Sequence, residues 1–306
     1  MKRFCTAAVC FFIVLSLWAK SLPVSGSFDW MRAQSVASGI RLKDFTYNKP
    51  RPLKVYAVRI DLAHPDIYLV TNQRDKDWGQ AMPDYPQMKI QTRRTRVYDF
   101  MQSYQRSGQD MRLAVNASPW RPWTKPFTHK YAGSIGLMVS NGTVVALPKK
   151  RTVPALVVRK NGKVELIKFK EGDKTSDIQL ALSGFEIVLQ DGKQVCNNKI
   201  VLHPRTFYGL SRDGSKLYLV IADGRQKDYS EGMALCEGAR FLKYLGADDG
   251  INMDGGGSTT LVTGSNGKAE VVNTPPGAGQ ADKKDKYKYT RKVANSLGVC
   301  LRKKQK

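Results

Sequence analysis

The chain has 306 residues, which is enough for one large domain or two small ones with an ample core. Lysine and arginine total 50 against 26 acidic residues, so the net charge is +24 and an anionic partner is favoured. The three histidines are scattered and no cysteine lies in a Cys-x-x-Cys or Cys/His spacing, which argues against a structural zinc site.

The N-terminus is typical of an export signal. Lys2 and Arg3 give it a basic start, residues 7–18 form an apolar run too short for a comfortable membrane span, and residues 24–26 are small enough for cleavage. We therefore predict a signal peptide over residues 1–26, a periplasmic or extracellular location and no stable membrane span after cleavage, with an uncleaved anchor as the alternative. Nucleic acid is then not an expected partner. The expected partners are phosphorylated or anionic glycans and phospholipid head groups. The alternative is a basic surface that is solvated and has no dedicated partner.

Residues 27–50 lack a long periodic pattern and are predicted to be an N-terminal lead-in to a domain over residues 51–306. From Leu53 onward alternating residues indicate short strands, and Asn141-Gly142, Asn161-Gly162 and Asp191-Gly192 follow strand-like runs. These dipeptides favour hairpins because primed turns need positive φ angles. Antiparallel sheet is therefore expected in the middle third of the chain.

Two helices are predicted. Residues 92–107 place Val97, Phe100 and Met101 on one helical face, and residues 231–245 repeat such a face before Gly246. The predicted fold class is α+β, with mixed, largely antiparallel sheets, at least two helices and one strand–helix–strand unit that carries the site.

That strand–helix–strand unit ends each of its strands in an acid. Residues 216–222 are a near-continuous apolar run, typical of a buried strand, and lead into Asp223-Gly224-Arg225. The second helix follows, and then a short strand over residues 251–253 that leads into Asp254 and three glycines. If both strands share a sheet, the helical connection makes them parallel, so that Asp223, Arg225 and Asp254 open onto one crevice.

Two carboxylates and an arginine at one rim suit several chemistries. A carboxylate pair suits glycoside cleavage. Arg205 and Arg225 could hold a phosphate, and the amides of Gly255, Gly256 and Gly257 could cradle its oxygens. The alternative is a structural Asp–Arg ion pair beside a glycine turn.

Several motifs, taken in order, resemble the phosphodiester glycosidase family over roughly residues 50–302. They are Leu113-Ala114-Val115-Asn116, His203-Pro204-Arg205-Thr206, Asp223-Gly224-Arg225, Glu231-Gly232-Met233 with Glu237, Asn252-Met253-Asp254-Gly255-Gly256-Gly257-Ser258, Val271-Val272-Asn273 and Arg291-Lys292-Val293-Ala294-Asn295. One departure follows Asn116, where the family usually has a glycine and then aromatics. This chain has Ala117, Trp120 and Trp123 there, and a tryptophan at this place is either a sugar-stacking platform or core packing.

The resemblance implies hydrolysis of a sugar-1-phosphodiester at its glycosidic C–O bond, with release of the sugar and a phosphomonoester. It implies catalytic or positioning roles for three acids, with Asp254 at the anomeric centre and Asp223 and Glu237 beside it. The substrate-binding residues it implies are Arg205, Arg225, Asn116, Asn252, Gly255, Gly256, Gly257, Ser258 and Asn273. No cofactor is expected, and the resemblance does not require a metal.

Two other functions stay open at this point. One is a non-catalytic factor that binds anionic glycan in exopolysaccharide or cell-envelope metabolism, and the other is a phosphodiesterase that cleaves P–O. Metal-dependent enzymes of the second kind usually need more His and Asp ligands than this chain offers. The sugar, the polymer, the stereochemical outcome, the oligomeric state and the pairing among Cys196, Cys236 and Cys300 are also open.

Overall fold

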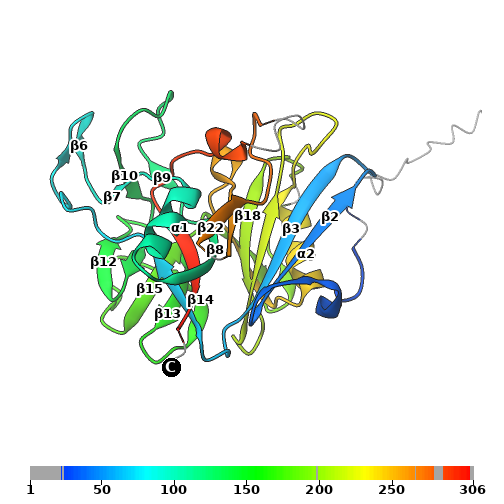
Figure 1. Cartoon of the computed structure of the whole chain (residues 1–306). Helices are drawn as coiled ribbons and strands as arrows, with labels where there is room; N and C mark the ends of the chain where they lie inside the picture. Colours follow the sequence, from blue (N-terminus) through cyan, green and yellow to red (C-terminus); the bar gives the residue numbers. More distant parts are fainter. Residues whose placement is uncertain (1–21, 23, 198, 266, 279–284, 304–306) are drawn as a thin grey trace, which may run out of the picture.

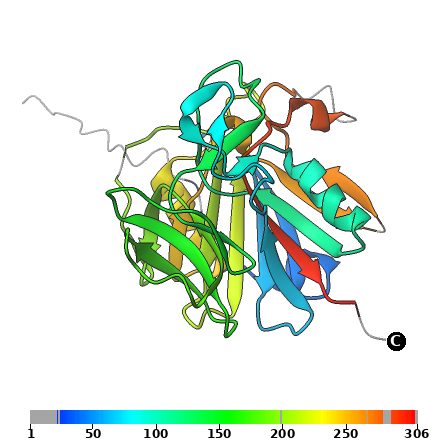
Figure 2. The same ribbon diagram turned by 90° about the vertical axis from the view of Figure 1, so that its left-hand side faces the viewer.

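The computed structural model describes residues 22, 24–197, 199–265, 267–278 and 285–303. Most of the expected signal peptide, residues 1–26, lies outside these described residues. Every strand pair in the described part is antiparallel, and short strands make up most of the molecule (Figures 1 and 2).

Three large sheets form the body of the protein. The first has eight strands in the order β1 (Gln34–Ala37), β2 (Ile40–Tyr47), β3 (Leu53–Asp61), β19 (Lys216–Ala222), β18 (Arg205–Leu210), β20 (Asp249–Asn252), β16 (Glu186–Gln190) and β17 (Lys193–Gln194). The second has five, in the order β22 (Lys268–Val271), β21 (Leu261–Ser265), β8 (Asp110–Asn116), β23 (Ser296–Leu301) and β4 (Ile67–Thr71). The third has five, in the order β12 (Thr143–Ala146), β11 (Met138–Ser140), β15 (Ile178–Ser183), β13 (Val153–Arg159) and β14 (Val164–Phe169).

Two small sheets complete the described strands. One consists of β7 (Thr92–Arg93), β10 (Tyr131–Ser134) and β9 (Trp120–Arg121), and the other of β5 (Ala81–Met82) and β6 (Tyr85–Lys89). Short 3-10 helices are η2 (Trp30–Arg32), η3 (Gly256–Ser258) and η4 (Lys286–Tyr289).

The three large sheets share one central core, and two helices cover outer faces. On β19, Leu219 and Ile221 point into the central core, while Val220 and Ala222 point to the opposite side, where α2 (Leu235–Leu245) packs. Because β19 is buried on both faces, its sequence is apolar at nearly every position, as predicted. The other helix, α1 (Val97–Arg106), packs on the second sheet (Figure 1).

The predicted hairpins are confirmed. Asn141-Gly142 connects β11 to β12, and Asp191-Gly192 connects β16 to β17. All four of these residues have positive φ angles, between 48° and 74°, as primed turns require. Asn161-Gly162 likewise lies between β13 and β14.

Both predicted helices exist, but each begins later than expected. Residues 92–93 form β7 and pair with β10, so α1 begins at Val97. Residues 231–233 pair with neighbouring loops, as when the amide of Met233 donates to the carbonyl of His203 over 2.9 Å, so α2 begins at Leu235. Backbone pairing with neighbouring strands and loops therefore keeps the residues before α1 and α2 out of the helices, in spite of their helical periodicity.

The segment before residue 51 contributes more than the sequence indicated. Strand β2 pairs with β3 along its whole length. Its apolar residues change face halfway, since Ile40 and Leu42 join the central core and Phe45 and Tyr47 join the core beneath α2. When the apolar residues of a strand change face, the sequence shows no regular alternation of apolar and polar residues. This is why no strand was predicted from the sequence at residues 40–47.

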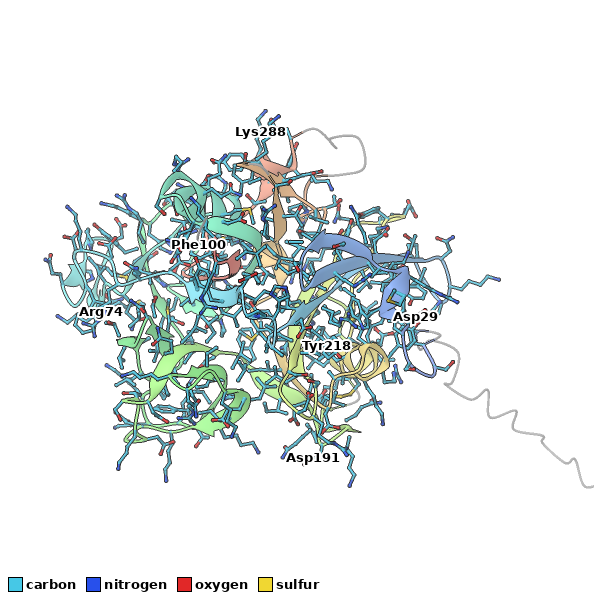
Figure 3. The ribbon with its side chains drawn as sticks, turned by 60° about the horizontal axis from the view of Figure 1, so that its bottom comes forward. Asp29, Arg74, Phe100, Asp191, Tyr218 and Lys288 are labelled. Carbon is cyan, nitrogen blue, oxygen red and sulfur yellow. A yellow bond between two sulfur atoms is a disulfide. The ribbon has the colours of Figure 1, made fainter. Side chains whose placement is uncertain are left out.

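Other features bear on the environment of the protein. Cys196 and Cys236 form a disulfide, and Cys300 is a buried free thiol. Within the described residues no helix is long and apolar enough to cross a membrane. Side-chain nitrogens project all round the outline of the molecule, so the positive charge is not confined to one face (Figure 3).

Candidate active site

A pocket of about 450 Å³ opens at the end of the eight-stranded sheet where β19 and β20 finish and β18 begins, which is its upper end in Figure 1. Its lining residues are Trp123, Lys125, Phe127, Phe185, His203, Pro204, Arg205, Arg225, Met253, Asp254, Gly255, Gly256, Gly257 and Arg291. A larger cavity, of about 930 Å³, lies beside β4 and contains none of the residues predicted for the site. Of these two cavities, only the smaller pocket is lined by residues predicted for the site.

The strand–helix–strand unit has the expected geometry. Strands β19 and β20 both pair antiparallel with β18, which lies between them, so they run parallel to each other with α2 in the connection. Asp223, Arg225 and Asp254 consequently lie at the same end of the sheet. Only Arg225 and Asp254 line the pocket.

Asp254 is buried, with 3% of its surface exposed. Its Oδ1 accepts the amide of Gly255 over 2.9 Å, and its Oδ2 has no hydrogen-bond partner within the described residues. Burial raises the pKa of Asp254 to about 6, against the lowering influence of the Ser258 hydroxyl, the Gly255 amide and the charge of Arg291. With a pKa of about 6 the group is mostly a carboxylate at neutral pH, and its Oδ2 is a buried acceptor without a hydrogen-bond partner within the described residues.

The three glycines after Asp254 let two arginines and one loop approach the backbone. A β-carbon at Gly255 would lie 2.7 Å from the carbonyl oxygen of Pro204, and one at Gly257 would lie 2.6 Å from Cζ of Arg291. Gly256 has a φ of +62°, and its amide donates to Pro204 over 2.8 Å. Since the amides of Gly255 and Gly256 are already bonded within the protein, the proposed cradle of three amides is not available as predicted.

Three guanidinium groups surround the pocket without an ion-pair partner among the described residues: those of Arg205, Arg225 and Arg291. Arg205 donates to the carbonyls of Met233 and Val201 over 3.3 and 3.2 Å, and Arg291 lies over the ring of Phe127, 4.6 Å from its centroid. Burial and the neighbouring Arg225 lower the pKa of both Arg205 and Arg291. Three cations with Asp254 as the one acid of the lining leave an excess of positive charge that favours an anionic ligand, and planar guanidinium forks suit a phosphate.

His203 adds a neutral donor to this group. Burial and the charges of Arg205 and Arg225 lower the pKa of His203 below its usual 6.5. Nη2 of Arg225 lies 3.3 Å from Nδ1 of His203, and a guanidinium can only donate, so Nδ1 accepts. In the neutral ring the hydrogen is then on Nε2.

Asp223 lies outside the pocket lining, in a buried network. Its carboxylate accepts hydrogen bonds from Nδ2 of Asn273 (2.8 Å), the amide of Thr274 (3.0 Å) and the hydroxyl of Tyr229 (3.0 Å). Burial raises the pKa of Asp223 to about 6 in spite of these bonds. The contacts tie the loop that carries Arg225 to the loop after β22.

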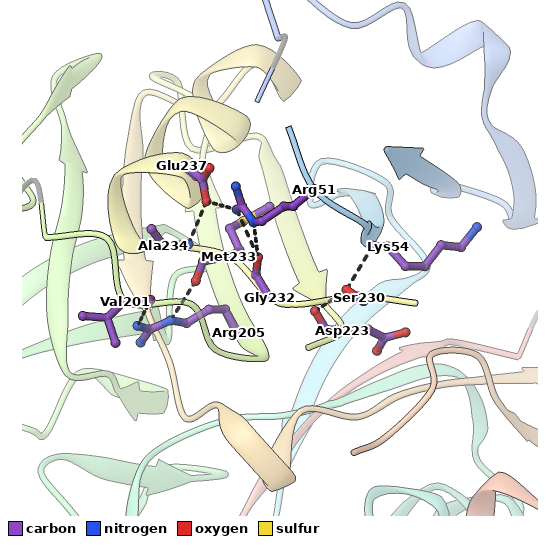
Figure 4. A network of polar contacts seen from close by, with 10 residues as sticks. All are labelled: Arg51, Lys54, Val201, Arg205, Asp223, Ser230, Gly232, Met233, Ala234 and Glu237. Carbon is purple, nitrogen blue, oxygen red and sulfur yellow. Dashed lines mark hydrogen bonds and ion pairs between the residues drawn. The ribbon is translucent and has the colours of Figure 1, made fainter. Parts of the chain in front are cut away.

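Glu237 is also outside the pocket lining. It forms a buried ion pair with Arg51 and accepts the amide of Ala234 over 2.9 Å at the start of α2. Arg51 donates in turn to the carbonyl of Gly232, next to Met233, whose carbonyl holds Arg205 (Figure 4). Glu237 therefore supports the segment on which Arg205 rests.

The remaining predicted residues are buried around the pocket, not in its lining. Nδ2 of Asn116 donates to the carbonyl of Asp254 over 2.7 Å, and Oδ1 of Asn273 accepts the amide of Leu261 over 2.7 Å. Asn252 and Ser258 are buried, and Oδ1 of Asn252 and Oγ of Ser258 have no hydrogen-bond partner within the described residues. Asn116 thus holds the backbone at Asp254 in place, and Asn273 holds the backbone at Leu261.

Sequence reasoning missed several lining residues. Arg291 and His203 stood in the quoted family motifs but were not assigned to the site. Trp123 lines the pocket and is 62% exposed, whereas Trp120 is core. Phe185 had no local signal at all, because it comes from the turn between β15 and β16.

Within the described residues no group of three or more His, Cys, Asp or Glu side chains could hold a metal ion. Oxygen ligands for such an ion are correspondingly few in the pocket, where Asp254 is the one acid of the lining.

Solved structures share the fold. The catalytic domain of zebrafish N-acetylglucosamine-1-phosphodiester alpha-N-acetylglucosaminidase, auto-inhibited by its pro-peptide, superposes with a TM-score of 0.60 and 20% identity over 89% of this chain and 87% of that one. A hypothetical protein from Synechocystis (TM-score 0.54, 14% identity, 87% and 63% covered) and a candidate exported protein from Burkholderia pseudomallei (0.53, 14%, 82% and 74%) are also similar. At these identities the likeness establishes the fold alone.

A search among curated proteins found no match. The family model of phosphodiester glycosidases matches residues 112–300, a span that includes Asn116, Arg205, Arg225, Asp254 and Arg291. This span is more than half of the chain, and the protein therefore belongs to the phosphodiester glycosidase family.

Proposed function

We propose that the protein is a hydrolase that cleaves the glycosidic C–O bond of a sugar-1-phosphodiester and releases free sugar and a phosphomonoester. The observation that carries this proposal is the pairing of one buried carboxylate, Asp254, with Arg205, Arg225 and Arg291 in one pocket. The carboxylate suits the positive charge that develops at an anomeric carbon, and the guanidinium groups suit the phosphate that leaves.

The proposed division of labour follows from the chemistry of the leaving group. The leaving group is a phosphomonoester, which departs as a stable anion, so the bond can break without a strong general acid. Arg205, Arg225 and Arg291 hold the phosphate and take up the negative charge that it gains, and Nε2–H of His203 adds a donor. Asp254, as a carboxylate, acts at the anomeric carbon on the opposite side of the breaking bond. Asp223 and Glu237 act as positioning residues for the arginines.

Export completes the proposal, with residues 1–26 as signal peptide and residues 51–306 as the phosphodiester glycosidase-like domain. The disulfide between Cys196 and Cys236 supports it, because disulfides persist mainly in oxidising compartments outside the cytosol. The similar protein from Burkholderia pseudomallei, described as a candidate exported protein, points the same way. A phosphorylated glycan of the cell envelope or of an exopolysaccharide is then within reach of the enzyme.

The test is release of free sugar from N-acetylglucosamine-1-phospho-mannose in ¹⁸O-labelled water, by the wild-type protein and by Asp254→Asn. We expect sugar release by the wild type, label in the sugar hydroxyl, and loss of at least about a thousandfold in kcat for the variant. Label in the phosphate would instead identify a phosphodiesterase. A folded protein that cleaves no diester of a panel but binds anionic glycan would be a binding factor.

A further inference from the structure

Large apolar side chains are exposed at the mouth of the pocket. Trp123 and Phe185 both line it, and they are 62% and 49% exposed. Val201, whose carbonyl contacts the pocket residue Arg205, is 46% exposed, and its chain neighbour Ile200 is 65% exposed. An exposed apolar cluster around a binding pocket commonly marks contact with an apolar ligand or surface.

This apolar mouth is joined directly to the anion-binding group. Val201 accepts a hydrogen bond from Nη2 of Arg205 through its carbonyl, and Phe185, Trp123 and Arg205 line the same pocket. A phosphodiester has two substituents. If the sugar lies at buried Asp254, the second substituent must leave the phosphate toward the mouth and cross these apolar side chains.

The mouth is poorly suited to a second sugar. A sugar hydroxyl donates a hydrogen bond as well as accepting one, so a second sugar at the mouth would need side-chain acceptors in addition to an aromatic platform, whereas lysine and arginine only donate. Apart from Asp254, the polar side chains of the lining are all lysine, arginine or histidine, and it contains no Ser, Thr, Asn, Gln or Glu. An alkyl chain needs no such partner and gains from burial against Trp123 and Phe185.

Resting on the proposed function, we infer that the second substituent on the phosphate is a long apolar alcohol, so that the substrate is a glycosyl-1-phospholipid. In the reaction the bond between C1 of the sugar and the phosphate oxygen breaks, water supplies the new hydroxyl of C1 and one proton, and the lipid keeps the phosphate as a monoester. The chain carries a net charge of +24, of which Lys2, Arg3 and Lys20 of the proposed signal peptide account for three, so the mature protein remains strongly basic. This charge favours approach to an anionic lipid surface on which such a substrate is presented.

The first test compares two synthetic substrates that share one sugar-1-phosphate and differ in the alcohol, decyl in one and methyl in the other. We expect kcat/KM to be at least about tenfold higher for the decyl diester, measured below its micelle concentration. In the double variant Trp123→Ser/Phe185→Ser that ratio falls toward one. Leu147→Ser, which removes a 50% exposed apolar side chain outside the pocket lining, keeps the ratio of the wild type.

A binding measurement covers the case in which neither diester is cleaved. By calorimetry, dodecyl phosphate should bind at least about tenfold more tightly than ethyl phosphate, and the double variant should lose this preference. Equal affinities for the two phosphates, or equal kcat/KM values for the two diesters, would overturn the lipid inference. A mannosyl diester preferred over the decyl diester would assign the aromatic rim to a sugar. If neither diester is cleaved but dodecyl phosphate is bound selectively, the hydrolase function is contradicted. The inference that the mouth of the pocket binds an apolar chain would then still hold.

Discussion

Arg291 lies so close to Gly257 that a β-carbon at that glycine would be 2.6 Å from Cζ of the guanidinium group. The same guanidinium lies over the ring of Phe127, with Cζ 4.6 Å from the ring centroid. Backbone and ring thus both lie against the cation at the pocket, and it has no ion-pair partner among the described residues. The third glycine of the run therefore serves the placement of an arginine that lies 34 residues later in the sequence.

Gly257→Ala should displace Arg291 and weaken phosphate binding. The methyl group meets a flexible side chain, so the fold should be retained and the melting temperature should change little. We expect KM for a sugar-1-phosphodiester to rise about tenfold, the loss of one charge-assisted contact. Gly133→Ala is the control, because its backbone needs no positive φ and its β-carbon would also meet only a side chain, Oε1 of Gln91 at 3.3 Å, outside the pocket lining. An unchanged KM in Gly257→Ala would show that Arg291 does not bind the phosphate.

Asp254→Asn should be more stable than the wild type at neutral pH. Burial raises the pKa of Asp254 from 3.8 to about 6, so folding disfavours the ionised form of this side chain. Replacing the carboxylate with a neutral amide should therefore raise the free energy of unfolding by at most about 3 kcal/mol. Because the folded state holds the proton more tightly, this gain should be present above pH 6 and vanish below pH 4. Urea unfolding at pH 7.5 and at pH 3.5 measures it, and a variant less stable than wild type at pH 7.5 would contradict the assignment.

Activity should fall in acid because the proposed mechanism uses Asp254 as a carboxylate. With its pKa at about 6, kcat/KM should drop about tenfold for each pH unit below that value. Asp223 has a pKa near the same value, so the profile of Asp223→Asn decides between the two groups. In Asp223→Asn, kcat/KM should still fall below pH 6. If this fall disappears in that variant, Asp223 is the group whose protonation controls activity.

Asp223→Asn should act through substrate binding. The carboxylate accepts three hydrogen bonds, whereas the nitrogen of an amide can accept none, so at least one anchor of the loop carrying Arg225 is lost. We expect KM to rise about tenfold with a smaller fall in kcat, by steady-state kinetics. Tyr229→Phe removes one of the three bonds and should show a milder form of the same effect. A fall in kcat as large as that of Asp254→Asn would place Asp223 in the chemistry.

Glu237→Gln should destabilise the protein more than it impairs catalysis. It leaves Arg51 buried without a charged partner, which typically costs about 3 kcal/mol or more. The variant keeps an acceptor for the amide of Ala234, so the start of α2 should persist. Urea unfolding and kinetics on the same preparation separate the two effects. A variant that is as stable as the wild type but inactive would indicate that Glu237 has a catalytic role.

Local sequence determined a large part of the fold. The Asn-Gly and Asp-Gly hairpins, the doubly buried strand β19 and the parallel relation of β19 and β20 all follow from patterns within a few dozen residues. Such features depend on backbone preference, on which side chains must leave water, and on the handedness of the helical connection. Asp223, Arg225 and Asp254 could be assigned to one end of the sheet for the same reason.

Tertiary structure decided which of the predicted residues face the pocket. Asp223 and Asp254 both follow strand ends, yet the first turns into a network with Asn273 and Tyr229, while the second keeps an oxygen without a partner. Spacing along a strand fixes the position of a carboxylate but not its partners, and two of those of Asp223, Asn273 and Thr274, come from a loop about fifty residues later in the chain. Arg291, Trp123 and Phe185 complete the pocket from three separate segments, because the packing of the sheets against one another brings those segments together, and no local pattern encodes that packing.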